Sequence, residues 1–299
     1  MKIKISPLTE TFGTLIESNG DNNIFDVNQE DIVSWFKNSS LLLFRGFAVD
    51  TEEFKKFSNL FSTEFMSYVG GAYSRVAIAG DKTLLSVTGG KLTFAVPFHG
   101  EMYYKQHRPE MMWFYCAMPP VKDGQTTICD GIEVYRQLSP ATKELFKHQK
   151  IKYIRTYQDG AWQQIYQTDD FSTVEEVCQA NNLRLQVNSD NSITTEYICP
   201  AVVETRNAKE QTFLNNILPV VAQEKQGQKA SLVRLEDNSV IPEEVIEEIQ
   251  AVTEKLTYLV NWQRGDIVML DNCRLMHGRK AFADTQRDIY VRLTNPAFN

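Results

Sequence analysis

A succession of short strand-like segments, each bounded by turn residues, restricts the fold of this chain more than any other feature. Between Leu84 and Tyr135 the segments LLSVTGG, LTFAVPFHG, MMWFYCAMPP and KDGQTTICD follow one another. Pro-Pro and Asp-Gly pairs mark the loops between them. The C-terminal segments GDIVMLDNCRLMHGRKAF and RDIYVRLTN return to the strand pattern. Many short strands of this kind predict an antiparallel barrel or jelly roll.

Helical patterns flank these strands. QEDIVSWFKN and TEEFKKFSNLF repeat apolar residues at helical spacing on either side of the buried strand LLLFRGF, and PEEVIEEIQAVTEKLTYLV does so later in the chain. Ser139 followed by Pro140 predicts the start of another helix, because serine is a preferred N-cap and proline a preferred first helical residue. We therefore expect a mainly β fold with flanking α-helices.

Composition excludes several classes of protein. With 299 residues, of which 42% are hydrophobic and 23% charged, the chain can bury a large core. No linker or repeat divides it, which predicts one domain over residues 1–299. No apolar stretch suits a membrane helix or signal peptide, so a cytoplasmic protein without membrane contact is expected. A net charge of −7 without a basic run argues against nucleic acid, and five scattered cysteines argue against a disulfide framework.

The segment FHGEMYY places His99 two residues before Glu101. Residues i and i+2 of an extended segment point to the same side, so both side chains can face one metal ion. His277, which follows the apolar strand DIVMLD, is the natural third ligand, whereas His107 and His148 are expected on the surface. Two histidines and one carboxylate leave positions open on the metal, as non-haem Fe(II) oxygenases require.

Other interpretations of this cluster exist. A His-x-Glu pair arises often by chance, and a non-enzymatic jelly-roll binding protein would use the same residues structurally. A zinc hydrolase with two histidines and one glutamate is a further alternative, but the chain has no His-Glu-x-x-His helix and no evident general base.

Several motifs, in order, resemble one family. VPFHGEMYY, CAMPPVKDGQTTICD, VYRQLSP, FLNN and DNCRLMHGRKAF are similar to segments of the taurine dioxygenase-like Fe(II)/2-oxoglutarate-dependent dioxygenases, from about Leu41 to the C-terminus. The nearest branch comprises amino-acid β-hydroxylases of nonribosomal peptide pathways. The resemblance implies a double-stranded β-helix in which His99, Glu101 and His277 bind Fe(II). It also implies that Thr126 helps to hold 2-oxoglutarate.

The arginine that binds 2-oxoglutarate has two candidates, Arg287 and Arg292. The two are five residues apart, so a regular strand turns them to opposite faces and both cannot line one pocket. The short histidine-to-arginine spacing of some relatives favours Arg287, whereas taurine-dioxygenase spacing favours Arg292. We favour Arg287 and expect the other arginine to be a salt-bridged surface residue.

The resemblance also implies the reaction. Such an enzyme consumes 2-oxoglutarate and O₂, releases succinate and CO₂, and hydroxylates an unactivated C–H bond; desaturation and ring closure use the same residues. The branch suggests an amino-acid-like small-molecule substrate, either free or tethered to an acyl or peptidyl carrier protein. The segment RTYQDGAWQQIYQTDD suits a lid over a polar substrate, although a surface loop is the simpler interpretation.

Overall fold

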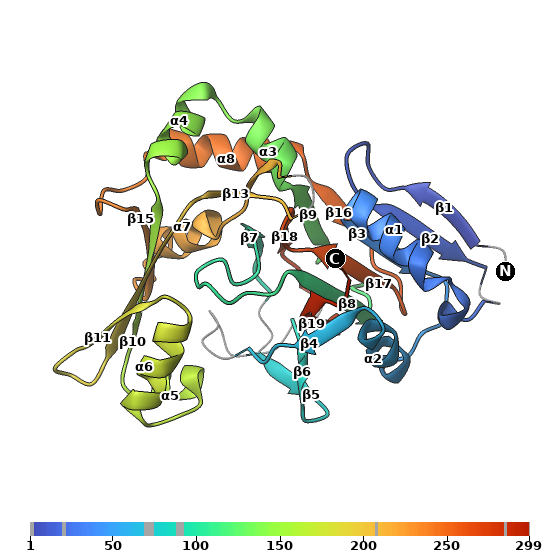
Figure 1. The fold of residues 1–299 in the computed structure, drawn as a ribbon, viewed down its shortest axis with the longest axis horizontal. Helices are drawn as coiled ribbons and strands as arrows, with labels where there is room; N and C mark the ends of the chain where they lie inside the picture. Colours follow the sequence, from blue (N-terminus) through green and yellow to red (C-terminus); the bar gives the residue numbers. More distant parts are fainter. Residues whose placement is uncertain are drawn as a thin grey trace.

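Residues 3–19, 22–68, 75–87, 93–206, 209–283 and 286–298 are described by the computed structural model. β-sheets dominate these residues and helices lie around them (Figure 1), which confirms a mainly β fold with flanking helices. The helices are η1 Ile24–Asp26, α1 Gln29–Ser39, α2 Thr51–Asn59, α3 Gly131–Gln137, α4 Pro140–His148, α5 Ala161–Tyr166, α6 Phe171–Ala180, α7 Ile217–Lys225 and α8 Glu243–Lys255.

The largest sheet combines the N-terminal and C-terminal parts of the chain. Its neighbouring strands pair antiparallel except for β2 and β3, which are parallel. β4 Ser62–Phe65 pairs with one of its central strands, β19. In spatial order the sheet contains β1 Ile3–Pro7, β2 Thr14–Ser18, β3 Leu41–Arg45, β17 Ile267–Asp271, β8 Met111–Met118, β19 Asp288–Pro296, β6 Asp81–Ser86 and β5 Val76–Ile78.

A smaller antiparallel sheet carries the two predicted histidine ligands. One apolar core joins Met112 and Val291 of the large sheet to Ile128 and Met276 of the small one. The two sheets therefore pack on a common core, as a jelly roll requires, and within the described residues they do not join into a closed barrel. The small sheet consists, in order, of β16 Tyr258–Val260, β9 Thr126–Asp130, β18 Leu275–Arg279 and β7 Val96–His99.

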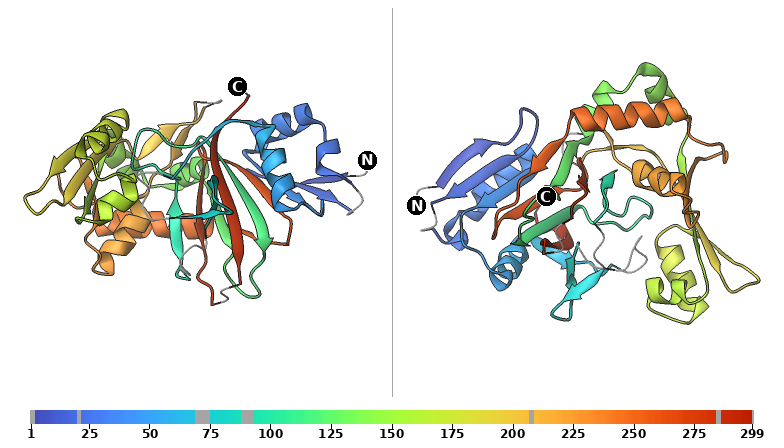
Figure 2. Two further views of the ribbon diagram at one scale, coloured as in Figure 1. Left: turned by 90° about the horizontal axis from the view of Figure 1, so that it is seen from below. Right: turned by 180° about the vertical axis from the view of Figure 1, so that it is seen from behind.

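A third sheet extends the molecule at the end opposite the N-terminus (Figure 2). Helices α5 and α6 cover one side of it through a cluster that includes Trp162, Val174 and Ile193, and α7 contacts β15 and β7. In order, this sheet contains β11 Arg184–Val187, β12 Ile193–Cys199, β10 Ile151–Tyr157 and β15 Ser231–Leu235; a separate pair is β13 Val202–Glu204 with β14 Gln211–Phe213.

The helix signals of the sequence are confirmed, except that α8 ends at Lys255 and the last residues of the segment PEEVIEEIQAVTEKLTYLV form strand β16. Ser139 caps α4 by accepting from the amide of Thr142, and Pro140 is its first residue. Val245 and Ile249 of α8 are buried, because the apolar face of this helix covers the core. The five cysteines are all free thiols. None of the described helices is long and apolar enough to cross a membrane.

Candidate active site

The two predicted histidine ligands lie opposite each other on adjacent strands. In the pairing of β7 with β18, His277 is the register partner of His99, and their ring centroids are 4.3 Å apart. Gly278 permits this close pairing, since a Cβ at that position would lie 2.5 Å from the carbonyl oxygen of Val96. Sheet register therefore brings together two residues that are 178 positions apart in the chain.

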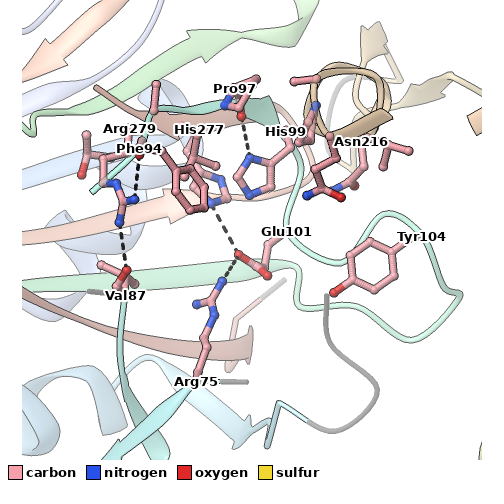
Figure 3. A pocket seen from close by; sticks show the side chains of 18 of the residues that line it. Arg75, Val87, Phe94, Pro97, His99, Glu101, Tyr104, Asn216, His277 and Arg279 are labelled. Carbon is pink, nitrogen blue, oxygen red and sulfur yellow. Dashed lines mark hydrogen bonds and ion pairs between the residues drawn. The ribbon is translucent and has the colours of Figure 1, made fainter. Parts of the chain in front are cut away.

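Glu101 completes the cluster from the turn after β7. Its carboxylate is 1% exposed, and its Oε2 lies 3.5 Å from Nε2 of His277. One ligand atom from each of Glu101, His99 and His277 lies within 4.8 Å of the other two. The structure thus assembles the three residues that the sequence predicted to bind metal (Figure 3).

The backbone of Glu101 is held by the side chain of Asn272, which precedes β18. Asn272 Oδ1 accepts from the Glu101 amide at 2.8 Å, and its Nδ2 donates to the Glu101 carbonyl at 3.1 Å. The same Nδ2 donates to the carbonyl of Pro109 at 2.6 Å. Asn272 is fully buried, so these bonds fix the carboxylate relative to the strand that carries His277. Asn272 lies in the motif DNCRLMHGRKAF, but its residue type and spacing predicted no role for it.

Arg75 is a second residue that the sequence did not reveal. Its Nη2 donates to Glu101 Oε2 at 2.9 Å, and its guanidinium stacks on the ring of Tyr68 at 4.2 Å. Burial alone would raise the pKa of Glu101, but Arg75 and the two histidines lower it below its usual range. The carboxylate is therefore ionised at neutral pH.

His99 is also in the form that binds a metal. Burial, and then the neighbouring His277, lower the pKa of His99 to about 3, so its ring is neutral at pH 7. Nδ1 of His99 lies 2.9 Å from the carbonyl of Pro97, which fixes the tautomer with a lone pair on Nε2. Two imidazoles and one carboxylate are the ligand set that non-haem Fe(II) uses, with coordination positions left open.

The cluster opens into a cavity of about 270 Å³ between the small sheet, β10 and α7. Thr126, the predicted cosubstrate residue, lines this cavity from β9. Its Oγ1 accepts from Nε1 of Trp262 at 3.0 Å, which leaves the hydroxyl hydrogen available for a carboxylate. Trp262 was not identified from the sequence, because its contact with Thr126 spans 136 positions.

Two arginines lie on the same wall of the cavity as Thr126. Arg287 is 2% exposed, and its Nε donates to the carbonyl of Gly124 at 2.8 Å. Arg279 comes from β18, opposite Thr126 in the sheet register. Burial, and then the charge of Arg279, lower the pKa of Arg287 to about 9. Two buried guanidinium groups repel each other, and a bound anion would stabilise the charged form of both.

Arg292 does not contribute to this cavity, and the expectation that the second arginine is a surface residue is wrong. Its side chain is 4% exposed and lies on the face of β19 that is turned away from the cavity. Nη1 donates to the carbonyl of Lys55, to Ser58 Oγ at 2.6 Å and to Asn59 Oδ1, so Arg292 caps the C-terminal end of α2. A cation is favourable there because the helix dipole places negative charge at that end.

The two remaining histidines lie on the surface, as expected. His107 and His148 are exposed, and His148 pairs with Glu144. Tyr104 lines the cavity, whereas Met102 and Tyr103 belong to the core.

The fold and the site together define a class: a jelly-roll protein with a buried two-histidine, one-carboxylate cluster beside an arginine-lined cavity. The model of the taurine catabolism dioxygenase TauD, TfdA family matches residues 4–294, and the chain belongs to this family. The predicted jelly-roll fold and enzyme class, an Fe(II)/2-oxoglutarate-dependent dioxygenase, are thereby confirmed.

Individual relatives are more distant. The dapdiamide synthesis protein DdaC of Enterobacter agglomerans is 28% identical over 275 residues, covering 86% of this chain and 82% of DdaC. The PvcB protein of Pseudomonas aeruginosa is similar in structure, with a TM-score of 0.64, 18% identity and coverage of 98% of this chain and 91% of PvcB. Another solved structure of PvcB, with a TM-score of 0.61, 18% identity and the same coverage of both chains, describes it as an Fe, α-ketoglutarate-dependent oxygenase from an isonitrile synthetic pathway.

Replacing Asn272 with alanine tests how Glu101 is positioned. We expect the Asn272→Ala protein to lose about 1–3 kcal/mol of unfolding free energy for each buried group left unsatisfied. Its affinity for Fe(II) should also fall by about 10–100-fold, as for other residues that orient metal ligands. Urea unfolding and an anaerobic Fe(II) titration measure the two effects. Asn38→Ala, on the exposed face of α1, is the matched control and should change neither. Unchanged Fe(II) affinity in Asn272→Ala would contradict this role.

Proposed function

We propose that His99, Glu101 and His277 bind the Fe(II) of this dioxygenase and that Thr126 and Arg287 bind the distal carboxylate of 2-oxoglutarate. The observation that carries this assignment is the juxtaposition of the three donors with Arg287 and Arg279 in one cavity. When bound, the iron and 2-oxoglutarate convert O₂ into an oxidant able to attack a C–H bond, with release of succinate and CO₂. The protein forms one catalytic domain over its length.

The residues of the chain orient the reaction. Asn272 and Arg75 hold Glu101, and the sheet register holds the histidines, so the three side chains that would hold the metal are fixed at the wall of the cavity. Arg287 supplies a charge-assisted hydrogen bond and Thr126 a hydroxyl donor to the cosubstrate carboxylate. The buried apolar side chains of Phe114 and Val220 line the cavity and limit the access of water to the reacting centre.

The substrate is an amino acid or an amino-acid-derived biosynthetic intermediate, and the outcome is hydroxylation. Both DdaC and PvcB belong to biosynthetic routes, and the resemblance to the amino-acid β-hydroxylases supports the same substrate class. Desaturation or ring closure of an intermediate is the second candidate outcome, supported by the same site. The sequence left open whether this substrate is free or tethered to a carrier protein.

Succinate release tests the proposal. Purified protein with Fe(II), ascorbate and 2-oxoglutarate is offered free amino acids, carrier-loaded amino acids and unrelated small molecules. We expect succinate to form in step with an oxidised amino-acid product. Turnover restricted to molecules that are not amino-acid-like would contradict the substrate class, while the absence of any Fe(II)-dependent turnover would contradict the assigned chemistry.

A further inference from the structure

Two buried polar side chains of the cavity lie outside the sets proposed to bind iron and 2-oxoglutarate. Arg155 lies in β10 and is 6% exposed, and Asn216 lies immediately before α7 and is 5% exposed. Both line the cavity that contains His99, Glu101 and His277. They approach it from the third sheet and α7 rather than from the wall that contains Thr126 and Arg287.

Arg155 is a buried cation without a counter-charge. Its Nε and Nη1 atoms are buried and have no hydrogen-bond partner in the described part of the chain. No carboxylate of that part forms an ion pair with it. Its guanidinium lies 3.4 Å from the centroid of the Tyr104 ring, which supports the charge without neutralising it. Because an uncompensated buried charge is costly, such a group is best explained by an anion that binds there.

The surroundings of Arg155 strengthen its attraction for an anion. Lys105, a buried neighbour, has its pKa lowered to about 8 by burial and then by the charge of Arg155. Arg75 adds a further cation, but its charge is already matched by Glu101. Among the described residues that line the cavity, Glu101 is the only carboxylate.

Asn216 supplies the complementary group, an unsatisfied acceptor. It occupies the N-cap position of α7, yet its side chain makes no capping bond. Asn215 takes that role instead, since its Oδ1 accepts from the amide of Ile217 at 3.0 Å. The amide of Asn216 is held by the hydroxyl of Tyr153 at 2.6 Å, while its Oδ1 is buried without a partner among the described residues. Figure 3 shows this side chain on the same side of the cavity as His99 and Tyr104.

We propose that Arg155 binds a carboxylate of the substrate and that Asn216 Oδ1 accepts a hydrogen bond from the amino group of the same molecule. This inference rests on the proposed function and specifies its substrate: an amino acid that enters with a free carboxylate. An aminoacyl thioester on a carrier protein lacks the α-carboxylate, so it fits only if its side chain provides one. Arg155 and Asn216 thus select for the two groups that distinguish amino acids from other small molecules.

Binding to the anaerobic enzyme tests this assignment. Wild-type protein with Fe(II) and 2-oxoglutarate is titrated with each of the standard L-amino acids and with their α-amides, and the metal-to-ligand charge-transfer band is followed. We expect at least one amino acid to perturb the band. Arg155→Gln should raise the Kd of that amino acid at least about 30-fold, the lower bound for truncating one side of a buried charge pair. Asn216→Ala should raise it about tenfold or more.

The α-amides identify the carboxylate. If the amide binds at least about 30-fold more weakly than the acid, Arg155 holds the α-carboxylate. If acid and amide bind equally and Arg155→Gln still weakens both, Arg155 holds a side-chain carboxylate. The proposal is overturned if no amino acid binds the wild-type protein or if Arg155→Gln binds it normally.

Control measurements distinguish a loss of amino-acid binding from a folding defect and from a failure of the proposed function. Arg184→Gln, an exposed arginine in the same sheet, should bind the amino acid as the wild-type protein does. Arg155→Gln should retain the wild-type Kd for 2-oxoglutarate, which a general structural defect would change. If wild-type protein forms no charge-transfer band, the iron and 2-oxoglutarate assignments fail. Calorimetry of the amino acids with metal-free protein then decides the Arg155 site by itself.

Discussion

Replacing His99, Glu101 or His277 with alanine is expected to lower Fe(II) affinity by more than about 100-fold in each case. The basis for this magnitude is that even residues that orient metal ligands contribute about 10–100-fold, and a ligand contributes more. Product formation should disappear with the metal. Anaerobic Fe(II) titration in the presence of 2-oxoglutarate measures the binding, and circular dichroism establishes that each variant is folded.

Exposed histidines provide the matched controls for this series. His107→Ala and His148→Ala should retain wild-type iron affinity, because both side chains lie on the surface. Glu101→Ala also leaves Arg75 buried without its carboxylate, so this variant should be less stable than His99→Ala. Undiminished iron binding in any of the three alanine variants would remove that residue from the ligand set.

Arg287→Ala is expected to raise the Kd of 2-oxoglutarate at least about 30-fold. A buried carboxylate that loses its guanidinium partner forfeits about 2–5 kcal/mol, and each ~1.4 kcal/mol is tenfold in affinity. Thr126→Ala should have an intermediate effect, since its hydroxyl is a neutral donor. The charge-transfer band of the anaerobic Fe(II) protein, titrated with 2-oxoglutarate, reports both values without knowledge of the substrate.

Arg292→Ala should give the opposite pattern. It should leave 2-oxoglutarate binding nearly unchanged but lower the free energy of unfolding by about 1–3 kcal/mol, because Ser58 and the end of α2 lose their buried donor. Weak 2-oxoglutarate binding in Arg292→Ala together with normal binding in Arg287→Ala would reverse the assignment.

The sequence predicted well wherever the signal is local. Alternation and turn residues marked the strands β6 to β9 and β17 to β19, and the Ser139-Pro140 pair marked the start of α4. The spacing of His99 and Glu101 also follows from local geometry, because an extended chain repeats its side-chain direction every two residues. His277 was found because it follows the apolar strand DIVMLD and lies in a recognisable motif, and the structure places it in the middle of β18.

The residues that the sequence did not reveal act across long separations. Asn272 and Trp262 contact the site over 171 and 136 positions, and neither residue type signals such a role by itself. Arg75 pairs with Glu101 only because the chain folds back from β5. These partners depend on the packing of sheets and loops, which no local pattern encodes.

By itself, the sequence determined the β-rich fold with flanking helices and both parts of the candidate metal site, the pair His99 and Glu101 and the separate His277. Periodicity and residue chemistry are properties of the chain before it folds. Only the tertiary structure decided which arginine faces the cavity: β19 turns Arg292 toward α2, whereas Arg287, just before this strand, reaches the wall that contains Thr126. It also decided that Arg155 and Asn216 share that cavity, because unsatisfied buried groups exist only once packing has removed them from water.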